Sequence, residues 1–279
     1  MNDERTACCT LCPHHCTLRE EETGFCRARV NRGGAVTAEN YGVLTALALD
    51  PIEKKPLRRF FPGSLILSAG SYGCNLRCPF CQNSDISQAG GGNAAARRVT
   101  PEWLVGQAEA LKGRGNIGLA YTYNEPLVGY EFVRDCAVLA RGRGLKNVAV
   151  TNGCFGEAPL RALLPWLDAV NIDLKAFTPR FYRWAGGDLE TVKSAVVLAA
   201  ERCHVEVTTL IIPGENDGEV EMEALSSWLA SVNPEIPLHV SRFFPCYLLQ
   251  DRPATPVETV YRLAECARRR LHYVYEGNC

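Results

Sequence analysis

Three cysteines of this chain are spaced closely enough to hold one inorganic centre. Cys74, Cys78 and Cys81 follow a C-x3-C-x2-C spacing, with the aromatic Phe80 directly before the third cysteine. Iron–sulfur clusters are held by closely spaced thiolates, so this loop can ligate three irons of a [4Fe-4S] cluster. The fourth iron then lacks a protein ligand and can bind a small molecule, whose chemistry the protein positions and shields. A structural zinc site usually has four ligands, which this loop alone does not supply.

A second group of cysteines lies near the N-terminus. Cys9, Cys12, Cys16 and Cys26 are separated by two, three and nine residues. Four thiolates are enough for a closed tetrahedral zinc site or for a second iron–sulfur cluster, and the spacing does not choose between them. The segment around them is polar and too short to form its own core, so metal binding would supply its folding energy. Reactive or idle surface thiols are the alternative.

The composition indicates the compartment and the class of protein. The chain has 279 residues, of which 47% are hydrophobic and 14 are cysteines, and its net charge is -1. It lacks a signal-like apolar N-terminus and any run of 18 apolar residues. We therefore expect a cytoplasmic protein with reduced cysteines and no membrane partner. The near-zero charge provides no field that would attract nucleic acid, and we expect no such partner.

The alternation of elements predicts the fold class. Short apolar runs rich in branched residues alternate with segments of helical period, which is typical of a parallel sheet. Thr100 and Pro101 predict a helix start, and Gly113 its end. A further helix is expected over residues 219–232. We predict a partial (β/α) TIM-like barrel of six or more parallel strands, with strands at residues 64–71, 117–123, 147–151, 169–174, 205–212, 237–243 and 272–275.

Polar side chains follow the predicted strands. In a parallel barrel the carboxyl ends of the strands and the loops after them form the active face. Asn124 and Glu125 follow the second strand, Asn152 follows the third, and Asp173 and Lys175 end the fourth. Turn and cap roles account for Asn152 as well as a functional role does. They account less well for Asp173 and Lys175, since a buried charge is costly unless it is paired or used.

Several of these segments together resemble one family. Residues 50–87, with 120–126, 171–177 and 239–245, are similar to the AmmeMemoRadiSam-system radical enzymes, which are relatives of pyruvate formate-lyase activating enzymes. The similarity extends from residue 9 to residue 278. It implies an open cluster iron that binds the amino and carboxylate groups of S-adenosylmethionine (SAM). The reduced cluster would cleave SAM to methionine and a 5′-deoxyadenosyl radical, which abstracts hydrogen from a protein or small-molecule substrate.

The resemblance also implies roles for individual residues and for a partner. Asn124 and Glu125 would contact the amino group of SAM. The rest of the cofactor pocket would be lined by Asn152, Asp173, Lys175 and the turn that begins at Ile211. The family also has the N-terminal cysteine set, but the resemblance does not identify the metal that these cysteines would bind. The electron that reduces the cluster would come from a reducing donor such as flavodoxin or ferredoxin.

The sequence leaves the domain division and the exact activity as hypotheses. We expect a cysteine-rich metal-binding segment and connector over residues 1–49 and the barrel over residues 50–279. Activation of a glycyl-radical enzyme is one alternative, although the chain lacks the Asp-Gly-Pro-Gly run usual in such activases. A non-catalytic electron carrier is the other. The substrate, the oligomeric state and the roles of Cys154, Cys246 and Cys279 are not assigned by the sequence.

Overall fold

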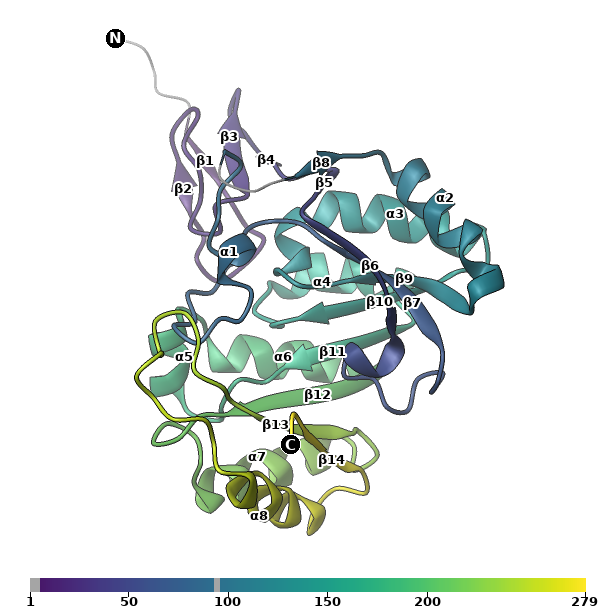
Figure 1. The fold of residues 1–279 in the computed structure, drawn as a ribbon. Coiled ribbons are helices and arrows are strands. Elements are labelled where there is room, and N and C mark those ends of the chain that lie inside the picture. The colour runs from purple at the N-terminus through teal and green to yellow at the C-terminus, as the bar shows by residue number, and fades with distance from the viewer. Residues whose placement is uncertain (1–5, 93–95) are drawn as a thin grey trace.

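The fold is built on one large sheet, shown in Figure 1. The computed structural model describes residues 6–92 and 96–279. Eight strands lie in the order β14-β13-β12-β11-β10-β9-β7-β6. Seven of them are parallel, which confirms the predicted fold class of a partial TIM-like barrel. These strands are β7 (Leu65–Gly70), β9 (Asn116–Tyr121), β10 (Lys146–Thr151), β11 (Ala169–Asp173), β12 (His204–Ile211), β13 (Leu238–Arg242) and β14 (Val274–Gly277).

The two edges of the sheet differ from the sequence prediction. Strand β6 (Ala46–Pro51) pairs antiparallel with β7 at one edge, and no strand was expected there. The apolar run at residues 46–49 is exposed or half-buried and contains no β-branched residue, so the sequence does not mark it as a strand. Strand β14 begins at Val274, two residues after the predicted start. The preceding Tyr273 contributes only its carbonyl, which accepts a bond from the Leu238 backbone N–H.

The helices follow the expected starts more closely than the expected ends. Thr100 caps α2 (Pro101–Ala110) by accepting a bond from the Trp103 N–H, as predicted. The helix ends at Ala110, before Gly113, because a short 3-10 turn (Lys112–Arg114) replaces its last turn. Helix α7 (Glu219–Val232) has the predicted bounds. The other helices are α1 (Ser84–Ser87), α3 (Tyr130–Gly142), α4 (Glu157–Leu163), α5 (Pro179–Ala185), α6 (Leu189–Ala200) and α8 (Val257–Arg268).

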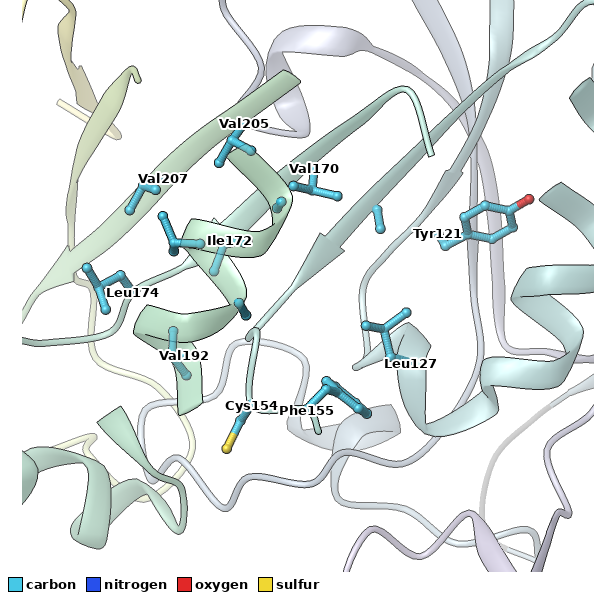
Figure 2. Close-up of a cluster of buried hydrophobic side chains, with 14 of the residues drawn as sticks. Tyr121, Leu127, Cys154, Phe155, Val170, Ile172, Leu174, Val192, Val205 and Val207 are labelled. Carbon is cyan, nitrogen blue, oxygen red and sulfur yellow. The ribbon is translucent and has the colours of Figure 1, made fainter. Parts of the chain in front are cut away.

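The core lies between the sheet and the helices that cover it. Figure 2 shows one part of this layer, where side chains of β11 and β12 pack against α6. Ile172, Val192 and Val207 are at most 2% exposed. Branched and aliphatic side chains on a parallel strand are buried on both faces of the sheet, so their burial holds the strand ends in fixed positions.

The N-terminal segment forms small antiparallel pairs beside the sheet (Figure 1). Strand β1 (Ala7–Cys8) pairs with β2 (Thr17–Leu18), and β3 (Arg29–Arg32) pairs with β4 (Ala35–Ala38). Strand β5 (Val43–Leu44) pairs with β8 (Arg97–Arg98). The proposed domain boundary between residues 49 and 50 lies inside strand β6, and the division stays a prediction. Among the described residues, the structure has no helix with the length and apolarity needed to span a membrane.

Candidate functional site

A cavity of about 750 Å³ lies at the carboxyl ends of the parallel strands. Its walls come from the loop after β7, the loop after β9 and the ends of β10 through β14. Three thiols and several charged groups therefore face one space. Most of the residues predicted to act on the cofactor line it, namely Cys74, Cys78, Phe80, Cys81, Asn124, Glu125, Asn152, Asp173 and Lys175. Ile211 does not, because the alternation along β12 turns Leu210 toward the cavity and buries Ile211 in the core.

The backbone of the cysteine loop is held by hydrogen bonds to the side chain of Asn124. The Asn124 amide group donates to the carbonyls of Tyr72 and Gly73, each at 3.1 Å, and its oxygen accepts from the Ser71 N–H at 3.0 Å. Gly73 has a φ of 88°, in the region that favours glycine. The side chain of Asn124 is thus engaged in holding the loop that carries Cys74.

The three thiols are shielded from solvent to different degrees. Cys78 is buried, whereas Cys74 and Cys81 are partly exposed. Burial raises the pKa of the Cys78 thiol to about 12 and raises that of Cys74 well above its usual value, so both are protonated without a metal. Ligation would replace those protons with metal bonds. Such thiols become thiolates when a cationic centre binds between them.

Phe80 joins the cysteine loop to helix α5. Its ring is 3% exposed and lies 5.6 Å from the Phe181 ring and 5.5 Å from the Trp184 ring. Cys246 Sγ donates to the Phe80 carbonyl at 3.3 Å. These contacts place an apolar ring beside the thiols and fix the orientation of the loop between Cys78 and Cys81.

Glu125 is a buried carboxylate at the cavity wall, 3% exposed. Its Oε1 accepts from the Leu127 N–H at 3.0 Å and from the Thr151 hydroxyl at 2.8 Å. Its Oε2 accepts from the Asn152 N–H at 2.7 Å. Burial outweighs these bonds and raises the pKa of Glu125 to about 7. The side chain therefore joins the ends of β9 and β10, and Oε2 keeps one acceptor position free.

Asn152 connects the third strand to the cysteine loop. Its amide group donates to Asn75 Oδ1 at 2.8 Å and lies 3.6 Å from Cys74 Sγ. Its Oδ1 accepts from the Cys154 N–H, so both ends of the amide are used. Amide N–H groups beside a thiolate stabilise its negative charge. Asn152 is thus placed to stabilise charge on Cys74.

Asp173 and Lys175 form the ion pair that the sequence left unexplained. Lys175 Nζ lies 2.6 Å from Asp173 Oδ2 at the end of β11. Burial alone would lower the pKa of Lys175, but the Asp173 carboxylate raises it overall, and the Cys78 and Cys81 sulfurs add to this effect when they are thiolates. A permanent cation therefore lies beside two of the three cluster cysteines.

Two further sets of charged residues at the cavity were not predicted. Lys55 is 3% exposed and lies 2.8 Å from Asp50 Oδ2, which also accepts from the Tyr123 hydroxyl at 2.6 Å. Lys55 belongs to the basic run at residues 54–59, and such a run is usually exposed to solvent. His239 lines the cavity and is held by Glu206 of β12 at 2.6 Å. Only the packing of the strands brings Tyr123 to Asp50 and His239 to Glu206, whereas Asp50 and Lys55 are five residues apart in the chain.

The four N-terminal cysteines share a separate, small pocket of about 10 Å³. Its other walls are mainly apolar, and its charged lining residue is Arg29. Burial raises the pKa of Cys12 to about 11, with smaller contributions from the other three thiols. Within residues 6–92 and 96–279, no three His, Cys, Asp or Glu side chains are drawn closely enough around one point to hold a metal ion. The pocket is lined by Cys9, Leu11, Cys12, Cys16, Gly24, Phe25, Cys26, Arg29, Val128 and Phe155.

Comparison with known proteins agrees with this geometry. Residues 69–225, more than half of the chain, match the model of the Radical SAM superfamily. The chain belongs to this superfamily. A Methanocaldococcus jannaschii protein described as uncharacterized is 41% identical over 279 residues, covering 99% of this chain and 82% of its own length. The AmmeMemoRadiSam name itself is not confirmed by these matches.

Other relatives have named activities. The pyruvate formate-lyase 1-activating enzyme of Escherichia coli K12 is 25% identical over 151 residues, which cover 53% of this chain and 61% of that enzyme. The match to this radical SAM relative therefore spans less than two thirds of its length. The solved structure of QueE from Escherichia coli has a TM-score of 0.52 at 14% identity, covering 84% of this chain and 92% of that one. This last likeness concerns the fold.

The residues of the cavity fit the cofactors of a radical SAM enzyme. Three cysteine thiols that face one cavity are a ligand set that could hold a [4Fe-4S] cluster and would leave its fourth iron open. A cubane cluster holds its cysteine sulfurs farther apart than a single ion does, so the thiols need not converge on one point. The carboxylate and amide groups around them can bind the polar end of SAM.

Proposed function

We propose that this radical SAM enzyme uses the cavity to cleave SAM reductively and to present a substrate for hydrogen abstraction. The observation that carries the proposal is that Cys74, Cys78 and Cys81 line the same cavity as Glu125 and the Asp173–Lys175 pair. When bound, a reduced [4Fe-4S] cluster supplies one electron to SAM, which gives methionine and a 5′-deoxyadenosyl radical. The rest of the chemistry depends on what the side chains of the chain bind, orient and shield.

Glu125 is the residue best placed to accept a hydrogen bond from the SAM amino group. A carboxylate has about four acceptor positions, and three of these are occupied by chain donors. The remaining position on Oε2 suits an ammonium group. Asn124 would act indirectly, because its amide already holds the loop backbone. Lys175 would stabilise the negative charge on Cys78 when it ligates iron.

The apolar part of the wall protects the reaction. Leu76, Phe80, Val150 and Leu210 line the cavity between the polar groups. A radical confined among such side chains is kept from water and from other hydrogen donors. A low-potential flavodoxin or ferredoxin is the proposed electron donor.

Anaerobic turnover tests this proposal. Reconstituted protein with dithionite and SAM should form methionine and 5′-deoxyadenosine in equal amounts. The variant with Cys74→Ala, Cys78→Ala and Cys81→Ala should form neither. Cys203→Ala is the matched control, because this half-buried thiol bonds to the Ala199 carbonyl away from the cavity. Undiminished cleavage by the triple variant would refute the ligand assignment, and the electron-carrier alternative requires that wild type form no 5′-deoxyadenosine.

A backbone glycine of a partner protein is the second candidate substrate. The 25% identity to a pyruvate formate-lyase activating enzyme favours it. In this case the cavity would admit an extended peptide, and a glycyl radical would persist on the partner after turnover. Electron paramagnetic resonance of a candidate partner, incubated with the reduced enzyme and SAM, tests this. A small-molecule substrate would instead carry deuterium from its own labelled position into 5′-deoxyadenosine without any radical on a partner.

A further inference from the structure

The N-terminal cysteine pocket differs from an ordinary cluster of buried thiols. Cys9, Cys12 and Cys16 lie in the β1–β2 hairpin and Cys26 lies in the turn before β3, and all four face one small space. The backbone brings them together, since the Cys9 N–H donates to the Cys16 carbonyl at 2.9 Å across the β1–β2 pair. Buried cysteines that act as small hydrophobes have no reason to gather in fours in a segment with so little core. Four thiols around one space are a ligand set.

Arg29 gives a second, independent indication of a bound group. It lines the same pocket and is 6% exposed. Its two terminal nitrogens bind Glu131 at 2.9 and 2.8 Å. Its Nε–H is buried and has no hydrogen-bond acceptor within the described residues. Buried donors in folded proteins are normally satisfied, and a metal-bound thiolate is a good acceptor. A cationic side chain with a free donor suits a centre on which four thiolates leave net negative charge.

The segment that carries the fourth cysteine lies directly on the radical-cluster loop. The Cys74 N–H donates to the Cys26 carbonyl at 3.2 Å. Gly73 fits closely here, because a Cβ at that position would lie 2.6 Å from the same carbonyl oxygen. Arg27 Nη2 donates to the carbonyl of Ser87 at 3.1 Å and to Gln88 Oε1 at 2.7 Å, beyond the cluster loop. The Cys26 carbonyl thus holds the cluster loop at Cys74, and the Arg27 side chain holds the chain that follows the loop at Ser87 and Gln88.

A second contact joins the two cysteine sets through His14. This residue lies between Cys12 and Cys16, and its ring stacks on Phe25 at 4.0 Å. Its Nε2–H donates to the Asn75 carbonyl at 2.8 Å. Asn75 directly follows Cys74 in the chain. The turn between Cys12 and Cys16 therefore holds the backbone at Asn75, directly after Cys74.

We propose that Cys9, Cys12, Cys16 and Cys26 bind a four-thiolate metal centre that fixes the radical-cluster loop through the Cys26 carbonyl and His14. The first half, the metal centre, stands independently of the proposed function. The second half, the coupling to the loop, rests on that function. Metal binding would draw the four sulfurs together. The backbone at Cys26 and the turn that carries His14, which both contact the radical-cluster loop, would move with them. Loss of this centre would then release the loop and hasten the loss of iron from Cys74, Cys78 and Cys81.

Metal analysis of the full chain tests the first half. The variant with Cys74→Ala, Cys78→Ala and Cys81→Ala isolates the N-terminal set, so its metal content does not depend on SAM chemistry. We expect it to retain either one zinc ion or an iron–sulfur cluster with acid-labile sulfide. Zinc analysis would detect the first, and analysis of iron and acid-labile sulfide would detect the second. Adding Cys12→Ala should abolish the bound metal and speed tryptic cleavage before residue 40. Adding Cys8→Ala instead should change neither, because Cys8 is exposed and outside the pocket. Absence of metal from the triple variant would overturn the proposal.

A variant that keeps all the cysteines tests the coupling. His14→Ala should retain the N-terminal metal but lose iron from the radical cluster several-fold faster when a chelator is added. His15→Asn is the matched control, because His15 is exposed and asparagine tolerates its positive φ of 42°. The readout is iron content over time, which does not need turnover. Equal iron loss in the His14→Ala variant and the wild type would show that the metal centre does not hold the loop, even if SAM cleavage itself is confirmed.

Discussion

The two cysteine sets of this chain contrast in almost every physical respect. Three thiols line a cavity of about 750 Å³ that also contains paired charges, amides and a carboxylate. Four thiols line a pocket of about 10 Å³ with mainly apolar walls. A site with an open ligand position needs room and polar groups for an exchanging ligand, whereas a closed site needs neither. Ligand count and surroundings thus point to reaction at the first site and support at the second.

Single cysteine substitutions are the strongest way to break this comparison. Cys81→Ala removes one of three cluster ligands, so 5′-deoxyadenosine formation should fall to the level seen without protein. Freshly reconstituted Cys16→Ala should keep cleavage within about 10-fold of wild type, the scale typical of losing an outer support of a metal site. Product formation in the first minutes after reconstitution measures both. Equal loss in the two variants would place both sets in the reaction.

Behind the cavity wall, the carboxylate of Glu206 holds His239, and acid should reveal its contribution to stability. Glu206 has no exposed side-chain surface. Although burial opposes ionisation, bonds from His204, His239 and two backbone N–H groups lower the pKa of Glu206 from 4.5 to about 2. The stability this gives is present above pH 4.5 and is lost as the pH falls toward 2, and it amounts to about 3 kcal/mol. Glu206→Gln should remove it.

Urea unfolding at pH 7 and at pH 3 measures this effect. The difference in unfolding free energy between wild type and Glu206→Gln should be large at pH 7 and smaller at pH 3. Glu201→Gln is the control, because Glu201 is exposed at the end of α6. A difference that stays constant with pH would mean that Glu206 is not ionised in the folded protein.

Substitution of Glu125 at the cavity wall tests which residue binds the amino group of SAM. Glu125→Ala should weaken SAM binding by about 10- to 100-fold, the loss expected for a charged hydrogen bond worth about 1.5 to 3 kcal/mol. The iron content should not change, since Glu125 bonds the chain and not the cysteines. Calorimetric titration of the anaerobic protein measures the affinity, with the exposed Glu109→Ala as control. Wild-type affinity would move the amino-group site elsewhere.

The smallest effect concerns where the wall of the cavity ends. Ile211 is fully buried in the core, and the neighbouring Leu210 lines the cavity. Ile211→Val should cost about 1 kcal/mol of stability and leave SAM affinity unchanged. Leu210→Ala should weaken SAM binding. Urea unfolding and titration measure the two effects, and a reversed pattern would show that the Ile211 side chain faces the cofactor.

Much of the fold was predictable because it depends on local pattern. The seven parallel strands were found from short apolar runs rich in branched residues, and Thr100 with Pro101 predicts the start of α2 through cap chemistry. Strand β6 was not predicted, because its apolar run of alternating alanine and leucine contains no β-branched residue and is not buried. Its pairing with β7 depends on contacts that no short window of sequence contains.

The site was predictable in its ligands and less so in its supports. The spacing of Cys74, Cys78 and Cys81 is a local signal, and the structure places all three at one cavity. The bond of Asp50 to Tyr123 joins the end of β6 to the loop after β9, and that of Glu206 to His239 joins β12 to β13. Their types are ordinary, and only the assembled sheet shows that they meet. The roles proposed for the cofactor contacts stay predictions.

The order of strands has a consequence for how the site is made. From β7 to β14 the parallel strands lie in the sheet in the same order as in the chain (Figure 1). Each unit can therefore dock on the one synthesised before it, which keeps the loops to be closed short. The cysteine loop follows β7, so the candidate cluster ligands are synthesised after the wall formed by residues 50–58 and before the walls formed by the later strands. Until β14 brings residues 276–278 to the cavity, the thiols remain accessible to whatever delivers iron and sulfide.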